Sequence, residues 1–426
     1  MSTEQTDKMK NTGEKKQGIY HGWWLVLTCF MLMALVLTPG VNLNHLFIVP
    51  ISEELGVSRT AVTAIVTFVT VISMVASVFA GKILAKKDIK KKMIIATIIF
   101  ALAMIGRGLL SNLWGQYLMS AISGAATIFL TSIPISILLN NWFGPKMRGR
   151  AMGIAMVGSS FGGLLLSPVI GYINENISWK ISFILIGVLA LVVVLPLIAF
   201  TISFDPSEKG LKRMGDEDAE AAAGGGTTLT GLTSVEAKKT PMYWLAFLTF
   251  TMYSIITIAY VGVFSPYFTD IGFSVTQAAS FYAIYSVIIM ISKVLLGFIN
   301  DKIGTLKSSV IAIIFILCGL SLTIVAANSV NMSVPSVVFM GIGLSLATVM
   351  LPLITAHLFG NRDYGAIVGI MNIGSALGGA IGPFGASLIF DYTGSYVNAW
   401  YVCVVIGIVM LITTIVIHKM RNKLSF

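Results

Sequence analysis

Residues 153–163 (GIAMVGSSFGG) and residues 369–379 (GIMNIGSALGG) are two copies of one pattern, and they decide the fold. They stand 216 residues apart, and the same spacing relates Pro50 to Pro266 and Gly81 to Gly297 without a gap. An offset that stays constant over so much of a chain indicates an internal duplication. The sequence therefore predicts two related halves.

The glycines of this pattern predict close contacts between helices. Lipid supplies no hydrophobic drive between helices, so small residues that let two backbones approach are favoured at their contacts. We expect these segments to lie where the two halves meet or slide. Ordinary packing within each half is the alternative.

The composition is that of an integral membrane protein. The chain has 426 residues, of which 56% are hydrophobic and 11% are charged, a balance that soluble domains do not show. A helix needs about 20 apolar residues to cross the hydrocarbon core, so the length allows about a dozen crossings. Apolar runs of this length fall at residues 22–49, 58–80, 93–113, 115–140, 149–173, 179–203, 242–266, 275–299, 306–327, 333–358, 364–390 and 396–418.

These runs predict an all-α membrane protein with twelve transmembrane helices in two pseudo-symmetric six-helix halves. Between the halves lies a polar stretch rich in Gly, Ala, Thr and charge, which is typical of a flexible linker. The predicted parts are an N-terminal tail (1–20), the first half (21–204), the linker (205–240), the second half (241–418) and a C-terminal tail (419–426).

The distribution of basic residues predicts the orientation. Of the 28 Lys and Arg residues, 24 fall on the side of the N-terminus and only Arg59, Arg107 and Lys180 on the other. By the positive-inside rule, both termini are cytoplasmic and the protein is a multi-pass component of the inner membrane. We expect a monomer that contacts the lipid bilayer and binds no nucleic acid.

Nothing in the sequence indicates an enzyme, a cofactor or a metal site. The three cysteines lie in apolar stretches, where a thiol behaves as a small core side chain. No carboxylate pair, metal-ligand cluster or nucleophile with a base falls in or beside the predicted spans. We expect no cofactor, no metal and no catalytic residue.

Lys293 stands out because it is a charge inside a predicted span, six residues before the cytoplasmic end of that span. All 18 acidic residues fall in predicted loops or termini, so no span offers it a partner. A lysine near the centre of a membrane helix costs roughly 2.5 to 3.5 kcal/mol and normally marks a polar pathway. Snorkelling of the ammonium to the lipid headgroups is the alternative.

A polar stripe accompanies Lys293. Tyr282 and Ser286 precede it by 11 and 7 residues, within about 40° of it on a helical wheel, which favours a water-facing side and an anionic substrate. Arg107 lies near the outer end of its span, where we expect it to anchor at the headgroups. Further side chains that could bind a carboxylate or hydroxyl are Asn42, His45, Tyr253, Tyr260 and Asn372.

In the loop after the second span of each half, the chain resembles the major facilitator superfamily. The second-half copy is GFINDKIGTLK (residues 297–307), whereas the first-half copy has Ala85 where the superfamily has an Asp. The resemblance covers essentially the whole chain and implies duplicated halves that rock about a central site. It also implies a motif that acts in the conformational change, carried here by Gly81, Gly297, Asp301, Lys302 and Gly304.

Four segments resemble the oxalate/formate antiporter family and the related monocarboxylate transporters: YHGWW (20–24), SEELGVSRTAV (52–62), NNWFGPKMRGRAMGI (140–154) and DPSEKGL (205–211). Those families usually have Arg where this chain has Lys293, and the oxalate carriers have a Lys in span eleven that is absent here. The resemblance implies secondary transport of a small organic anion such as lactate or pyruvate.

One positive charge matches one carboxylate better than two, which ranks a dianion lower. If protons are coupled, Lys293 is the simplest carrier, because a bound carboxylate favours its charged form. The alternatives are an anion exchanger of the oxalate/formate type and a membrane nutrient sensor that binds without transporting.

Overall fold

In the computed structural model the membrane region of the chain is built from helices wherever the structure describes it. The structure describes residues 20–84, 88–215, 231–345, 354–355, 357–360 and 362–421. Within these residues, eleven helices are long and apolar enough to cross a membrane, and Val330–Leu344 is a shorter apolar helix. It begins the predicted span at residues 333–358, of which residues 346–353 and 356 lie outside the described part.

The first half is built from nine α-helices and two π-helical segments, with a short 3-10 turn after the first of these. Their bounds are α1 His21–Leu32, η1 Met33–Asn42, η2 Asn44–Phe47, α2 Ile48–Leu55, α3 Arg59–Leu84, α4 Ile89–Leu109, α5 Leu113–Ile128, α6 Ser132–Trp142, α7 Pro145–Asn176, α8 Trp179–Leu189, η3 Ala190–Val194 and α9 Leu195–Thr201.

The second half repeats this plan after a polar connecting region, residues 205–240. The connecting region holds η4 Pro206–Lys209 and α11 Ser234–Lys238. The helices that follow are α12 Pro241–Gly262, α13 Phe264–Asp270, α14 Val275–Ile303, α15 Thr305–Ala326, η5 Val330–Met332, α16 Ser333–Leu344, α18 Tyr364–Thr393 and α19 Val397–Arg421.

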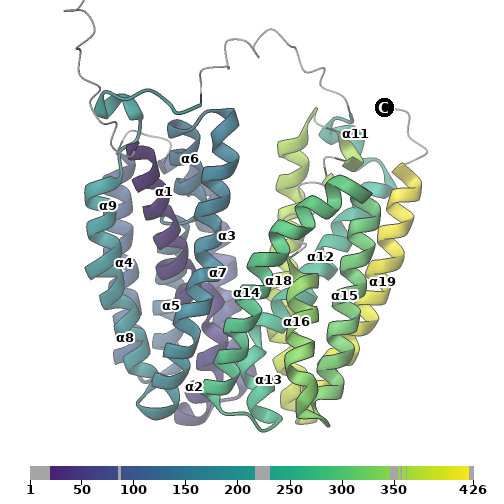
Figure 1. The fold of residues 1–426 in the computed structure, drawn as a ribbon. Helices are drawn as coiled ribbons and strands as arrows, with labels where there is room; N and C mark the ends of the chain where they lie inside the picture. Colours follow the sequence, from purple (N-terminus) through teal and green to yellow (C-terminus); the bar gives the residue numbers. More distant parts are fainter. Residues whose placement is uncertain are drawn as a thin grey trace, which may run out of the picture.

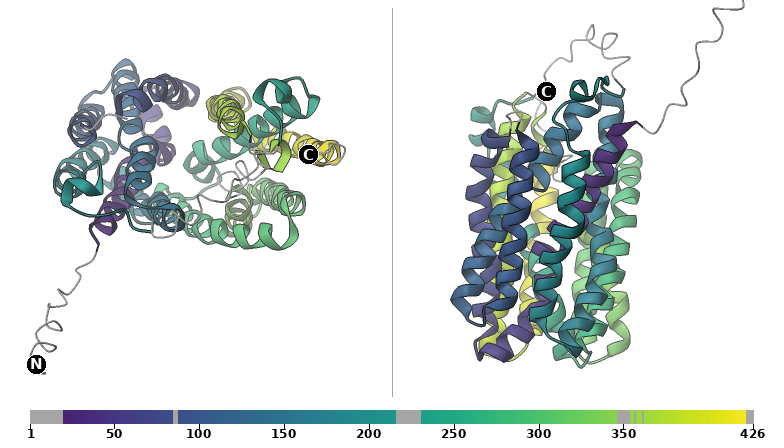
Figure 2. Two further views of the ribbon diagram at one scale, coloured as in Figure 1. Left: turned by 90° about the horizontal axis from the view of Figure 1, so that it is seen from above. Right: turned by 90° about the vertical axis from the view of Figure 1, so that its left-hand side faces the viewer.

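The two halves form two bundles that stand side by side (Figure 1). Their ribbons lie apart at the end where α1 begins and α19 ends, and they come together at the opposite end, near α2, α13 and the start of α14. Seen from above, in the left view of Figure 2, the two bundles again lie next to each other. We call the end where the halves meet the closed end.

The outward faces of the bundles are apolar, as contact with lipid requires. Phe79, Phe200 and Val405 are 57%, 80% and 61% exposed, and many other large apolar side chains share this exposure. In water such a surface would be a strong aggregation site. In the bilayer it needs no covering, which supports the assignment as a multi-pass membrane protein.

The first predicted span differs from a regular helix. It continues from α1 into the π-helical segment η1, which contains Pro39, and then into the 3-10 turn η2. Proline removes a backbone donor and clashes with the preceding turn, so it forces such adjustments. The irregularity places Asn44 and His45, which are buried, at the closed end.

The repeated glycines make the close contacts that their spacing predicts, but most of these contacts lie within a half. A Cβ on Gly162 of α7 would meet the backbone of Ala34, and one on Gly378 of α18 would meet the backbone of Thr251. Among the described glycines of the two copies, Gly163 faces the other half, against Ser286, and the nearby Gly171 does so too, against Ala279. Both segments nevertheless lie on helices at the contact between the halves, because α7 packs against α14 and α18 packs against α3, where the hydroxyl of Thr67 donates to the carbonyl oxygen of Ala380 at 2.9 Å.

Candidate functional site

Lys293 lies on α14, which runs without a break from Val275 to Ile303. Its side chain is half-buried. No hydrogen bond or ion pair joins its ammonium to any residue of the described part of the chain. The residue 216 positions earlier is Ser77 on α3, so this charge has no counterpart in the first half.

The predicted stripe on α14 faces the first half. Ser286 is buried, donates a hydrogen bond of 2.9 Å to the carbonyl oxygen of Tyr282, and lies against Gly163 of α7. Nearby, the hydroxyl of Ser167 on α7 donates to the carbonyl oxygen of Ala279 on α14 at 2.8 Å. Lys293 is two helical turns beyond Ser286 on the same face. Lys293 therefore lies on the side of α14 that faces the first half, nearer than Ser286 to the end where the two bundles separate.

His45 and Tyr282 meet across the two halves. Their ring centroids are 4.4 Å apart, and the His45 ring also lies 5.6 Å from the ring of Phe264 on α13. The cluster continues through Tyr285 to Tyr260, whose ring also packs on Trp400. The structure thus brings His45, Tyr282, Ser286 and Tyr260 into one region at the closed end.

The other predicted site residues lie apart from this cluster. The hydroxyl of Tyr253 donates to the carbonyl oxygen of Leu344 at 2.8 Å, which fixes it within the second half. Asn42 is half-exposed at the end of η1, and Asn372 is exposed on α18. Neither asparagine has a hydrogen-bond partner among the described residues.

The predicted conformational motif lies where α3 and α14 end, at the opposite end of the molecule from the closed end. Gly81 lies within α3, and Gly297, Asp301 and Lys302 lie within α14. Gly304 follows α14 with a φ of 82°, a left-handed value that favours glycine. The surroundings of Gly81, Gly297 and Asp301 lie outside the described part of the structure.

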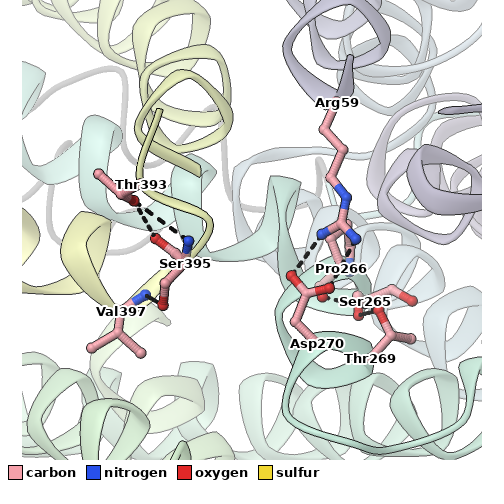
Figure 3. Close-up of polar contacts among 8 residues, drawn as sticks. All are labelled: Arg59, Ser265, Pro266, Thr269, Asp270, Thr393, Ser395 and Val397. Atoms are coloured by element: carbon pink, nitrogen blue, oxygen red, sulfur yellow. Dashed lines mark hydrogen bonds and ion pairs between the residues drawn. The ribbon is translucent and has the colours of Figure 1, made fainter. Parts of the chain in front are cut away.

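An ion pair joins the halves at the closed end. Both terminal nitrogens of Arg59, at the start of α3, donate to the carboxylate of Asp270, at the end of α13, at 2.6 and 2.8 Å (Figure 3). The Arg59 guanidinium also lies 4.2 Å from the ring centroid of Phe390 on α18. A bidentate pair is stronger and more directional than a single contact, so this pair has the geometry of a latch.

Two acidic side chains cap helices of the opposite half. The carboxylate of Asp391 accepts the backbone N–H of Thr60 at 3.1 Å, and that of Glu175 accepts the backbone N–H of Thr276 at 2.8 Å. A carboxylate at a helix N-terminus satisfies a free donor and complements the helix dipole. The two contacts are images of each other, because the spacing of 216 residues relates both Thr60 to Thr276 and Glu175 to Asp391.

Arg107 does not sit at the headgroups as the sequence suggested. It is only 2% exposed, and its guanidinium lies 3.9 Å from the ring centroid of Phe183. It donates to the side-chain oxygens of Gln116 at 3.2 Å and Asn44 at 3.3 Å. Its position near the end of α4 suggested an exposed anchor, whereas its side chain turns inward and ties α4 to η2.

The internal repeat contains a pattern that predicts two of the contacts at the closed end. The relation between Thr60 and Thr276 was evident from the repeat, and extending it would have paired Glu175 with Asp391. Polar residues conserved between two copies of a repeat are candidates for symmetric contacts. Arg59 and Arg107 have no such signal, because Val275 and Thr323 stand at the related positions.

Comparisons with known proteins agree on the class of protein. The model of the Major Facilitator Superfamily matches residues 23–307 and, separately, 245–423. The hexuronate transporter of Bacillus subtilis (strain 168) is 25% identical over 63% of this chain, and the chain spans 65% of that relative. Monocarboxylate transporter 12 of Rattus norvegicus is 22% identical over 93% of this chain and 84% of its own length.

A solved structure shows the same fold. A bacterial homolog of the human lysosomal transporter Spinster, in an inward-facing and occupied conformation, has a TM-score of 0.69 at 13% identity, over 95% of this chain and 99% of its own. The match of the family model extends over more than half of the chain. The chain therefore belongs to the Major Facilitator Superfamily, a family of transporters and not of enzymes.

Proposed function

We propose that this member of the superfamily carries a small organic monocarboxylate across the inner membrane by alternating access, with Lys293 as the group that binds the carboxylate. The observation that carries the proposal is a half-buried ammonium without an anionic partner among the described residues, on the face of α14 that turns toward the other half. An unpaired cation in this position is stabilised by an anion from solution.

The relatives support the substrate class. Monocarboxylates and hexuronates, which the names of two relatives specify, each carry one carboxylate on an otherwise uncharged body. A single Lys293 suits one such group and leaves the body of the substrate to polar and aromatic neighbours. The hydroxyl-bearing side chains of Tyr282 and Ser286 lie on the same face of α14, and we assign them to the substrate path together with Lys293.

The conformation follows from the orientation. With both termini cytoplasmic, as the basic residues predict, the closed end faces outward and the structure is the inward-open state of the cycle. Arg59, Asp270 and the two acidic caps then form the outer gate. The linker (205–240) joins the two six-helix halves, which we expect to rock about the site.

Two other functions compete with this proposal. An exchanger of the oxalate/formate type would use the same cation but would require a counter-substrate on the opposite side. A sensor would bind the anion without moving it. The single positive charge favours a monocarboxylate over oxalate in both cases, and liposome uptake separates transport from sensing.

The test is binding and uptake by the purified protein. A thermal-shift screen against short-chain monocarboxylates, hexuronates and oxalate should show stabilisation by one of the first two classes. Lys293→Gln should weaken that binding by about 100-fold or more, since loss of one partner of a buried ion pair costs about 3 to 5 kcal/mol.

The matched control is Lys239→Gln, which removes an exposed lysine far from the site and should bind normally. Uptake into proteoliposomes should follow binding. Normal binding and uptake by Lys293→Gln would contradict the assignment of the site, and binding without uptake in the parent protein would favour the sensor.

A further inference from the structure

His45 is buried in an unusual way. It lies in the 3-10 turn η2 and is only 2% exposed, yet neither ring nitrogen has a hydrogen-bond partner among the residues that the structure describes. Instead, the ring packs against Tyr282 and Phe264, two mutually contacting rings of the second half. A buried polar group without a partner costs roughly 1 to 3 kcal/mol, so an imidazole is a poor choice for a purely structural contact.

The surroundings hold this imidazole in its neutral form. No carboxylate contacts it among the described residues: Asp270 on α13 binds Arg59, Glu175 on α7 binds the Thr276 N–H, and Glu54 on α2 binds Lys180. The remaining ionisable neighbours are the tyrosines of α12 and α14 and the guanidinium of Arg107, held by the adjacent Asn44. A second positive charge here would be buried without compensation.

The repeat shows that packing does not require a histidine. The residue 216 positions later is Val261, which is half-buried in the second half and carries no polar atom in its side chain. His45 is therefore an asymmetric feature, like Lys293. Its ring also lies at the contact that has to break when the outer gate opens, because its two ring partners belong to the other half.

We propose that His45 is a proton-binding residue of the transport cycle, neutral while the outer gate is closed and protonated when the gate opens. Opening separates the ring from Tyr282 and Phe264 and admits water to its nitrogens, one of which then accepts a proton. The inference rests on the proposed function in one respect: a carboxylate entering from outside would be the counter-ion that lets the protonated ring be covered again. Proton and anion would then enter together.

The direction of the pH effect follows from linkage. The closed gate excludes the proton, whereas an exposed imidazole binds it near pH 6.5. Lower pH therefore favours the open gate, and the ratio of open to closed molecules rises by up to about tenfold for each pH unit below 6.5. This response needs no substrate, so it can be measured separately from anion transport.

The experiment measures the outer gate directly. Spin labels on Ser111→Cys and Asn328→Cys, exposed residues at the closed end of the two halves, report the distance between the halves in the protein reconstituted in liposomes. The exposed Cys318 is first replaced by Ser, while Cys29 and Cys403 are buried. Between pH 7.5 and 5.5 the population with the longer distance should increase severalfold.

His45→Phe is the decisive variant, because it keeps an aromatic ring but binds no proton. It should abolish the rise between pH 7.5 and 5.5 while leaving any response of the gate carboxylates at lower pH. A second variant, His45→Asn, guards against a packing artefact and should also be insensitive in this range. Lys293→Gln should keep the pH response even where it has lost the anion. An equal pH response in His45→Phe and the parent would overturn the proposal.

Discussion

The two halves of the molecule share a scaffold but not their chemistry. The hydroxyl of Thr38 donates to the carbonyl oxygen of Ser159 in the first half, and Ser254, 216 residues later, donates to that of Ser375 in the second. The capped N-terminal turns at Thr60 and Thr276 are repeated in the same way. These contacts hold helices together, which both copies need equally.

The charged and titratable residues differ at related positions. Lys293, Arg59 and His45 have Ser77, Val275 and Val261 as their counterparts. These three residues belong to one copy only, so the plan that the two halves share does not depend on them. The comparison teaches that the repeat-related residues define the fold, whereas residues that break the repeat are the first candidates for substrate, proton and gate.

The largest expected effect is on the shared scaffold. Gly162→Ala and Gly378→Ala each place a methyl group against the backbone of the neighbouring helix, and overpacking of this kind costs about 1 to 3 kcal/mol. We expect both variants to lower the thermal unfolding temperature in detergent by similar amounts.

Gly153→Ala and Gly369→Ala are the matched controls, also related by the repeat, with no atom within 4 Å of the added carbon. They should be neutral or stabilising by up to about 1 kcal/mol, because alanine favours a helix over glycine. Strongly unequal losses at Gly162 and Gly378 would show that the two halves do not share one packing solution.

A smaller effect is expected at the two acidic caps. Glu175→Gln and Asp391→Asn remove a negative charge from a helix N-terminus, an interaction of about 0.3 to 1 kcal/mol. Each should raise the ratio of open to closed outer gate about two- to fivefold, measured with the same pair of spin labels at pH 7.5. Glu236→Gln, which removes the acid of a capping box in α11 away from the gate, should have no effect. Opposite shifts at the two caps would contradict their symmetric role.

Most of the fold follows from the sequence, because the apolar runs and the repeat extend over many residues. A local break in one helix does not change either pattern. The spans, the halves and the close glycine contacts were predictable in this way. The break of the first span at η1 and η2 was not, since Pro39 indicates a kink but not its direction. The inward turn of Arg107 was also missed, because its partners Gln116 and Asn44 are amides that no charge pattern reveals.

The sequence predicted individual site residues but not the contacts between them. Lys293 stood out by charge alone, and its placement on the face of Tyr282 and Ser286 followed from helical periodicity. Sequence could not show that His45 packs on Tyr282, since the contact joins residues more than 200 positions apart through the docking of two halves. Whether these residues bind the substrate stays a prediction.

The carboxylates at one pair of related positions have diverged within the repeat. Glu54 and Asp270 are 216 residues apart, and each lies in the last turn of a short helix at the closed end. Asp270 reaches across to Arg59 of the other half. Glu54 stays within its own half, where it binds Lys180 at 2.5 Å and accepts the indole N–H of Trp179 at 2.6 Å. The acidic residue at this position thus joins the two halves in one copy and makes contacts within its own half in the other.

The smallest expected effect is therefore that of Glu54→Gln, which should leave the gate unchanged and slightly destabilise the first half. The hydrogen bond from Lys180 lowers the pKa of the Glu54 carboxyl, so its stabilisation is present above about pH 4.3, the ordinary value, and is lost as the pH falls through the lower folded value. Both partners are partly exposed, so we expect less than about 1 kcal/mol. The unfolding temperatures of Glu54→Gln and the parent should differ slightly at pH 7 and converge below pH 4, while the spin-label distances stay the same.

Asp270→Asn is the contrasting variant, because it removes the partner of Arg59 and should lengthen the distances between the spin labels at pH 7.5. If Glu54→Gln opened the gate as Asp270→Asn does, the two copies would share this function after all, and the asymmetry of the closed end would rest on Arg59 alone.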